Sequence, residues 1–127
     1  MRPSPLIFIV DDDPVCLNSV GTLLRSFEYD VRTFSSAEEF LEADVDLVHG
    51  CLLCDIRMPG MSGLELLKTL RLKGITLPVI LISGYTDSET VGAAEEHGAI
   101  AVLDKPTRPR ALVECIQAAF QESKHTC

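Results

Sequence analysis

The chain has little positive charge for its length. Its 127 residues include 11 lysines and arginines against 19 aspartates and glutamates, a formal net charge of −8 at pH 7. Such a balance is repelled by phosphate backbones and anionic lipid headgroups, so we expect no unaided binding to nucleic acid or to a membrane surface. The same excess of carboxylates is compatible with a metal ion or another cationic ligand.

Long hydrophobic runs and targeting signals are also absent from the sequence. No apolar run approaches the roughly 20 residues that a membrane-spanning helix needs, and the first residues show no signal-peptide pattern. We therefore expect a cytoplasmic location and no membrane partner. With 46% hydrophobic residues, the chain is long enough for one domain with its own core, which we assign to residues 1–127.

The cysteines form no disulfide framework. There are five of them, an odd number without regular spacing, which is typical of a reducing compartment. Cys51 and Cys54 do form a Cys-x-x-Cys pattern, but they fall within a predicted strand, where residues three apart point to opposite faces. We interpret them as small buried apolar residues and not as a redox pair.

Five apolar segments alternate with segments of helical periodicity. The predicted strands are 6–10, 29–34, 51–54, 79–82 and 99–103, and the segment 44–50 is predicted as a loop. Continuous apolar strands that alternate with helices indicate a parallel sheet covered on both faces. Because right-handed crossovers leave few topologies, we predict a flavodoxin-like (βα)5 fold, a doubly wound parallel sheet with strand order 2-1-3-4-5.

Short capping patterns mark where the helices begin. Ser62 and Glu65 form a Ser-x-x-Glu capping box, and similar patterns predict helix starts near Ser36 and at Thr86. Thr107 is predicted to cap the last helix. The helix that follows Thr86 has a weak apolar stripe, so we expect it to be less firmly packed than its neighbours.

One carboxylate stands at the end of the third predicted strand. Asp55 directly follows the apolar run that starts at Cys51, and it precedes a turn that contains Pro59 and Gly60. In open α/β sheets the carboxyl ends of the strands, just before the strand-to-helix loops, are where ligands bind. We interpret Asp55 as a nucleophile that accepts a phosphoryl group.

Other polar side chains follow the neighbouring strands. These are Asp11 and Asp12 after the first strand, Ser83 at the end of the fourth and Lys105 after the fifth. Because parallel strands end at one edge, we expect all of them in one crevice with Asp55. Three nearby carboxylates repel one another unless a cation is present, and an all-oxygen ligand set favours Mg²⁺. The ammonium group can then pair with a phosphoryl oxygen.

These segments together resemble the receiver domain of response regulators in two-component signalling. The matching pieces are Val10-Asp-Asp-Asp13, Leu53-Cys-Asp-Ile-Arg-Met-Pro-Gly-Met-Ser-Gly63, Ile82-Ser-Gly84 and Leu103-Asp-Lys-Pro106. They occur in the family's order and span nearly the whole chain. The segment around Asp55 is most similar to that of FixJ-type receivers.

The resemblance implies a phosphoacceptor and a metal site. Asp55 would receive the phosphoryl group from a phosphohistidine on a sensor histidine kinase or a phosphotransfer protein. Asp12, Asp55 and the backbone carbonyl of Arg57 would bind Mg²⁺ (or Mn²⁺), and Asp11 would assist through water. The chain would then be a signalling switch that acts catalytically only on itself, and not an enzyme with external turnover.

The resemblance also implies how the site would respond. Ser83 and Lys105 would contact the phosphoryl oxygens, and the bond between Lys105 and Pro106 would be cis. Receivers usually carry Tyr or Phe where Val102 stands, and Phe where Thr107 stands. An aromatic rotation coupled to the hydroxyl is therefore excluded, and we expect either switching through movement of the backbone or of a loop, or weaker switching.

The expected output is a change in the surface formed by the fourth helix, the fifth strand and the fifth helix. In the family this surface also supports homodimers on phosphorylation. FixJ-type receivers usually precede a DNA-binding domain, so the chain would either control transcription through such a domain or act as a single-domain relay.

Three other functions are compatible with parts of the sequence. Asp11-x-Asp13-x-Val15 resembles the motif of haloacid-dehalogenase-like phosphatases, which would make Asp11 the nucleophile but leave the Asp55 segment unexplained. A flavodoxin-like carrier of FMN would need a hydroxyl- and glycine-rich loop where this chain has three aspartates. A pseudo-receiver would act only as a binding module, although every residue needed for phosphorylation is present.

Overall fold

The computed structural model describes residues 6–43, 50–84 and 87–125, the last five of them by their backbone alone. Strands and helices alternate strictly along these residues. The strands are β1 (Leu6–Val10), β2 (Asp30–Phe34), β3 (Gly50–Asp55), β4 (Val79–Ser83) and β5 (Ala101–Asp104). The helices are α1 (Pro14–Ser26), α2 (Ala37–Glu42), α3 (Gly63–Leu72), α4 (Ser88–Glu96) and α5 (Pro109–His125).

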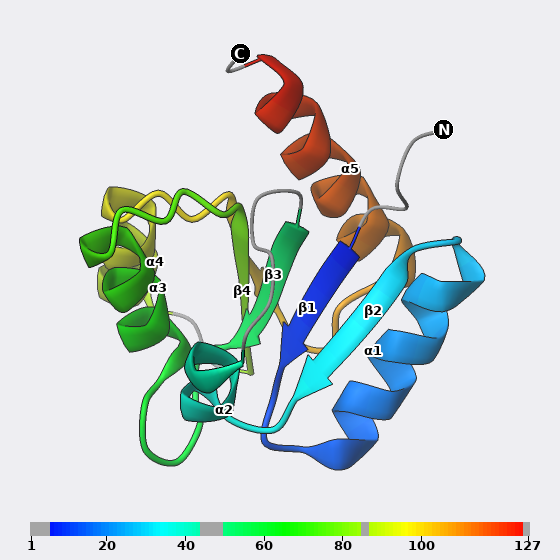
Figure 1. Ribbon diagram of the computed structural model, residues 1–127, viewed down its shortest axis with the longest axis horizontal. Coiled ribbons are helices and arrows are strands. Elements are labelled where there is room, and N and C mark those ends of the chain that lie inside the picture. Colours follow the sequence, from blue (N-terminus) through cyan, green and yellow to red (C-terminus); the bar gives the residue numbers. More distant parts are fainter. Residues whose placement is uncertain (1–5, 44–49, 85–86, 126–127) are drawn as a thin grey trace.

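The strands form one parallel sheet in the order β2-β1-β3-β4-β5. Helices α1 and α5 pack on one face of this sheet, and α2, α3 and α4 pack on the other (Figure 1). The predicted flavodoxin-like (βα)5 fold is therefore confirmed. Because the strands are parallel, their carboxyl ends lie at one edge of the sheet, toward the bottom of Figure 1.

Two apolar layers, one on each face of the sheet, hold the helices in place. Alternation along β1 sends Phe8 to the layer beneath α2 and α3, and sends Ile9 to the layer beneath α1 and α5. Strand β3 is buried along its whole length, as expected for the centre of a doubly wound sheet. Its carboxyl end is therefore fixed by packing from both sides.

The two cysteines of the Cys-x-x-Cys pattern lie in opposite layers. Cys51 faces the α1 and α5 side, and Cys54 faces the α2, α3 and α4 side. Both are buried and free of a disulfide. Burial raises the pKa of Cys51 to about 12, so its thiol stays protonated at neutral pH. Their interpretation as buried apolar residues is confirmed.

The start of α3 is the best-specified helix boundary. The Ser62 hydroxyl accepts a hydrogen bond from the Glu65 amide at 3.1 Å, and the Glu65 carboxylate accepts one from the Ser62 amide at 3.0 Å. The predicted capping box is therefore confirmed. The helix ends at Leu72, and Gly74 follows with a positive φ of 78°.

Two predicted caps were wrong. Helix α4 begins after Asp87, whose carboxylate accepts a hydrogen bond from the Thr90 amide at 2.7 Å; Thr86 lies outside the described residues. Helix α5 begins at Pro109, and the Thr107 hydroxyl donates instead to the carbonyl of Asp104. At α4 the cap is a neighbouring aspartate, and at α5 a backbone carbonyl competes for the hydroxyl of Thr107.

Every strand after β1 differs from its predicted bounds by one or two residues. Gly50 was predicted as loop but is the first residue of β3, where it pairs with Leu6. A Cβ atom at this position would collide with the ring of Phe8, so only glycine allows β1 and β3 to pair here. The rest of the predicted loop, 44–49, lies outside the described residues. Strand β5 starts at Ala101, two residues later than expected.

Helix α4 is the most weakly anchored of the helices with described side chains. Ala94 is its only buried residue, whereas α3 buries a glycine and three leucines.

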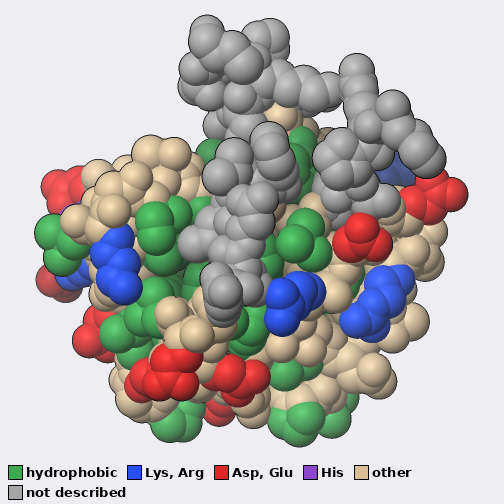
Figure 2. All heavy atoms as spheres, viewed as in Figure 1, with side chains coloured by type: hydrophobic (Ala, Val, Ile, Leu, Met, Phe, Trp, Pro, Cys, Tyr) green, Lys and Arg blue, Asp and Glu red, His purple; other side chains and the backbone are tan. Residues whose placement is uncertain are grey.

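None of the helices in the described ranges is long and apolar enough to span a bilayer. Charged side chains of both signs are interspersed on the face shown in Figure 2, so this face carries no single large patch of negative charge.

Candidate functional site

Three carboxylates meet where β1 and β3 end. Asp11, Asp12 and Asp55 each place one oxygen atom within 4.8 Å of the other two. Asp11 and Asp55 are buried, with exposed fractions of 7% and 8%, and Asp12 is exposed. The structure thus brings together the three aspartates that the sequence predicted for one crevice.

The turn after β1 holds Asp11 in place. Its backbone amide continues the pairing with β2 by donating to the carbonyl of Phe34 at 3.1 Å. Its carboxylate accepts a hydrogen bond from the Asp13 amide at 2.9 Å. Asp13 in turn caps α1 by accepting from the Val15 amide at 2.9 Å. The start of the helix therefore fixes the orientation of the buried carboxylate.

Asp55 is fixed by the end of β3 and by the loop that follows. It pairs with Ile82 of β4, and its Oδ1 atom accepts a hydrogen bond from the Arg57 amide at 3.2 Å. A Cβ atom at Gly63 would collide with the carbonyl oxygen of Asp55. The first turn of α3 can therefore lie directly against the phosphoacceptor candidate only because residue 63 is glycine.

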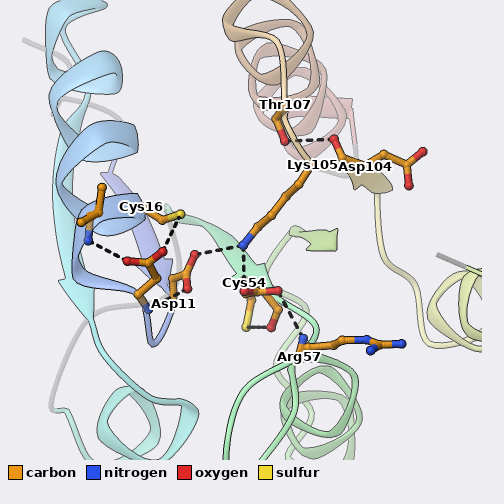
Figure 3. Close-up of polar contacts among 10 residues, drawn as sticks. Asp11, Cys16, Cys54, Arg57, Asp104, Lys105 and Thr107 are labelled. Carbon is orange, nitrogen blue, oxygen red and sulfur yellow. Dashed lines mark hydrogen bonds and ion pairs between the residues drawn. The ribbon is translucent and has the colours of Figure 1, made fainter. Parts of the chain in front are cut away.

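Lys105 reaches the carboxylates from the far side of the site (Figure 3). Its ammonium lies 2.9 Å from Oδ2 of Asp55 and 3.6 Å from Oδ2 of Asp11. Its backbone amide donates to the carbonyl of Ser83 at 2.8 Å. The peptide bond between Lys105 and Pro106 is cis, as the resemblance implied.

Ser83 and Arg57 also lie at this edge. Ser83 is the last residue of β4, is fully buried and pairs with Asp104 of β5. Arg57 follows Asp55 by two residues, and its side chain points away from the carboxylates (Figure 3). It is therefore the backbone of Arg57 that approaches Asp55, as its amide hydrogen bond demonstrates.

The electrostatics show an excess of negative charge in the crevice. Burial raises the pKa of Asp11 above its ordinary value; the hydrogen bond from the Asp13 amide opposes this, and the charge of Asp55 adds to the rise. Burial alone would lower the pKa of Lys105, but its hydrogen bond to Asp55 and its attraction to Asp11 raise it overall. Lys105 is therefore a permanent cation at neutral pH.

The donor set fits a hard divalent cation. The three carboxylates carry three negative charges when ionised, and Lys105 compensates one of them. The remaining formal charge of about −2 matches Mg²⁺ or Mn²⁺, and all of the available ligands are oxygen atoms. The pKa of Asp11 is raised mainly by burial, and the neighbouring charge of Asp55 adds to the rise.

A groove of about 640 Å³ lies beside the carboxylates. Asp55 and Lys105 line its inner end, and mainly apolar side chains line the rest, among them Val15 of α1 and Leu112 of α5. Val15 is 70% exposed. The groove is therefore open to solvent beside α1.

Sequence reasoning missed two long-range contacts, one of which lies beside the site. Glu38 of α2 accepts a hydrogen bond from the Met61 amide, in the loop that follows Asp55. Arg71 of α3 donates to the carbonyls of His97 and Gly98 at the end of α4. The partners are 23 to 27 residues apart, so no short motif could have indicated them.

Comparison with known proteins points to one family. Residues 7–117 match the model of the response regulator receiver domain. The transcriptional regulatory protein TdiR of Thauera aromatica is 42% identical over 114 residues, which cover 90% of this chain and 50% of TdiR. FixJ of Azorhizobium caulinodans is 38% identical over 123 residues, which cover 97% of this chain and 58% of FixJ. The chain thus spans about half the length of these relatives.

Solved structures show the same relationship. The response regulator StyR superposes with a TM-score of 0.89 at 37% identity, over 98% of this chain and 63% of StyR. The crystal structure of FixJ-N gives a TM-score of 0.84 at 34% identity, over 95% of this chain and 96% of the other. A CheY-like receiver domain from Methanospirillum hungatei gives 0.87 at 32% identity, over 98% of this chain and 100% of the other.

Proposed function

The chain belongs to the response-regulator receiver family, and on that basis we propose that it is a signalling switch whose Asp55 accepts a phosphoryl group from a protein phosphohistidine. The observation that carries this proposal is the contact of the Lys105 ammonium with Asp55, next to Asp11 and Asp12. This arrangement places a nucleophilic carboxylate, a permanent cation and a metal-ligand set at one point. Phosphoryl transfer asks a protein mainly for such positioning and charge stabilisation.

In the proposed transfer, a carboxylate oxygen of Asp55 attacks the phosphorus atom of the phosphohistidine. An oxygen–phosphorus bond forms, the phosphorus–nitrogen bond breaks, and its electron pair stays on the imidazole of the donor protein. Lys105 remains charged throughout and pairs with a phosphoryl oxygen. The Arg57 amide, which already donates to Asp55 Oδ1, holds the other carboxylate oxygen in place.

Asp12, Asp55 and the backbone carbonyl of Arg57 would hold Mg²⁺ (or Mn²⁺), with Asp11 contributing through water. The ion supplies positive charge against the phosphoryl oxygens when it is bound. The buried position of Asp11 and its hydrogen bond from the Asp13 amide keep its carboxylate turned toward the site. We assign the catalytic roles to Asp55, Ser83 and Lys105, all of which act on the chain itself and not on an external substrate.

The proposed switch starts at Ser83. Its side chain lies fully buried at the end of β4, from where its hydroxyl would turn to bond a phosphoryl oxygen. Val102, which is half-buried against the core, has no ring to rotate in response. Movement therefore passes through the backbone after β4 to α4, whose single buried residue makes it the helix that is easiest to displace.

We place the output on the surface formed by α4, β5 and α5. The relatives named as transcriptional regulators are about twice as long as this chain, so we propose that residues 1–127 form one receiver domain that controls transcription through a DNA-binding domain elsewhere, or that relays the phosphoryl group. The donor is a sensor histidine kinase or a phosphotransfer protein in the cytoplasm, and phosphorylation favours a homodimer.

Intact mass after incubation with acetyl phosphate tests the proposal. The wild-type chain should gain one phosphoryl group only in the presence of Mg²⁺, and Asp55→Asn should gain none. An adduct that survives Asp55→Asn would point to Asp11 as nucleophile and to a phosphatase. No adduct on the wild type under any condition would favour a pseudo-receiver that only binds proteins.

Amide hydrogen exchange tests the switch separately. Phosphorylated and unphosphorylated protein should differ in exchange rates and chemical shifts between the end of β4 and the start of β5. Identical values across 86–103 would contradict a role for α4 in the output.

A further inference from the structure

Helix α2 makes a direct contact with the loop that follows Asp55. Oε2 of Glu38 accepts a hydrogen bond from the backbone amide of Met61 at 3.1 Å. The same oxygen lies over Gly60, where a Cβ atom would be only 2.6 Å away. Gly60 has a φ of 76°, a conformation that glycine adopts without strain. The turn and the carboxylate are therefore fitted to each other.

This contact closes the loop 57–61 at its outer end. At its inner end the Arg57 amide donates to Asp55 Oδ1 at 3.2 Å. Beyond the loop, the Gly63 amide donates to the carbonyl of Ile56 at 2.9 Å. The carbonyl of Arg57, which belongs to the proposed metal site, lies in the chain between the Arg57 amide and the Met61 amide. The contacts at both ends of the short loop restrict the orientation of this backbone.

Glu38 is not needed to begin its own helix. The cap of α2 is Ser36, whose hydroxyl accepts from the Glu39 amide at 3.0 Å. The Glu39 carboxylate stays local and accepts a hydrogen bond from the Ser35 hydroxyl at 2.7 Å. The two glutamates share the same helical turn and the same exposure to solvent, but only Glu38 reaches the neighbouring loop.

We propose that Glu38 is a positioning residue of the phosphoacceptor site. It holds the loop 57–61 in the arrangement that directs the Arg57 carbonyl toward Asp12 and Asp55, and so it sets the affinity of the site for Mg²⁺. This inference rests on the proposed function, because it assigns Glu38 a role in the same metal site. It adds an exposed residue of α2 to a site whose other members all follow strand ends.

The experiment compares four proteins: wild type, Glu38→Ala, Glu38→Gln and Glu39→Ala. Mg²⁺ alone is titrated and followed by the amide chemical shifts of the carboxylate cluster, without a phosphodonor. Hydrogen exchange of the Met61 amide is measured on the same samples. Glu39→Ala is the matched control, because it removes the same charge from the same helical turn.

Glu38→Ala should speed exchange of the Met61 amide and weaken Mg²⁺ binding by about tenfold, the lower end of what a metal site loses with an outer hydrogen-bond partner. Glu38→Gln, whose amide oxygen can still accept from Met61, should recover most of the affinity. Glu39→Ala should bind Mg²⁺ like the wild type. The rate of phosphorylation by acetyl phosphate should fall in Glu38→Ala at low Mg²⁺ and recover at saturating Mg²⁺.

Unchanged Mg²⁺ affinity in Glu38→Ala would overturn the inference and leave the proposed function intact. An equal loss in Glu38→Ala and Glu39→Ala would also overturn it, because the effect would then be one of charge and not of position. A wild-type protein that binds no Mg²⁺ and gains no phosphoryl group would overturn the proposed function and this inference with it.

Discussion

The Lys105 ammonium donates a hydrogen bond to Asp55 Oδ2 at 2.9 Å. Lys105 directly follows β5 and Asp55 is the last residue of β3, two strands that are separated in the sheet by β4. Lys105 therefore crosses the end of β4, where Ser83 lies, and its backbone amide is bonded to the Ser83 carbonyl on the way. The three residues proposed to act on the phosphoryl group are thus linked through Lys105, by its backbone to Ser83 and by its side chain to Asp55.

Replacing Lys105 by methionine should slow phosphorylation of Asp55 by acetyl phosphate about 100-fold, because the preorganised positive charge that stabilises the reacting oxygens is lost. The measurement is the rate of adduct formation by intact mass at saturating Mg²⁺. Arg110→Met is the control, since Arg110 is exposed on the first turn of α5 and the change in net charge is the same. Equal rates in Lys105→Met and wild type would contradict the role assigned to Lys105.

Glycine should be required at residue 63 and dispensable at residue 92. A Cβ atom at Gly63 would collide with the backbone of Asp55, whereas one at Gly92 meets nothing within 4 Å. We expect Gly63→Ala to lower the free energy of unfolding by about 2 kcal/mol or more. Gly92→Ala, within α4, should raise it by about 0.5–1 kcal/mol. Urea unfolding measures both, and a tolerated Gly63→Ala would mean that α3 shifts away from β3.

The capping box of α3 should make stability depend on pH. The hydrogen bond from the Ser62 amide lowers the pKa of Glu65 below its ordinary value of 4.5. A lowered pKa in the folded state stabilises the protein above the unfolded-state pKa, and this contribution is lost as pH falls through the folded-state value. Glu65→Gln should therefore be less stable than wild type at pH 7 and should approach it at low pH.

Thermal unfolding between pH 3 and pH 7 measures this difference. Glu114→Gln is the control, because Glu114 is exposed on α5 and caps no helix. A difference between wild type and Glu65→Gln that does not change with pH would show that the charge of the carboxylate contributes nothing to the cap.

Arg71 should hold the end of α4 in place. Its guanidinium donates to the carbonyls of His97 at 2.9 Å, Gly98 at 3.3 Å and Ile75 at 2.8 Å. Removing it in Arg71→Met leaves three carbonyls without this donor, which should cost about 2 kcal/mol of unfolding free energy. Amide exchange at the carboxyl end of α4 should also accelerate.

Lys68→Met is the matched control, because Lys68 is an exposed cation on the same helix. It should change stability by no more than about 0.5 kcal/mol. If amide exchange at the end of α4 were the same in Arg71→Met and wild type, the contact would not restrain that helix. The movement proposed for the switch would then extend to the carboxyl end of α4.

The sequence alone was sufficient for the fold and for the set of charged residues that meet at the carboxyl edge of the sheet. Continuous apolar strands, the Ser62 and Glu65 capping box and the short turns are signals carried within a few residues, and they specify which element forms where. Once the strands are parallel, Asp11, Asp55 and Lys105 must lie at one edge of the sheet, because each is at or directly after the carboxyl end of its strand. Their meeting therefore follows from topology and not from details of packing.

Tertiary structure decided the contacts that depend on how the helices lie against the sheet. Residue 50 can pair within β3 because glycine has no Cβ atom to collide with the ring of Phe8. Glu38 reaches Met61, and Arg71 reaches His97, across 23 and 26 residues of chain. Such contacts depend on the distance between packed elements and on the length of a side chain. A local sequence pattern does not indicate which side chain is long enough to reach its partner, because the distance between the elements is set only when the helices pack on the two faces of the sheet.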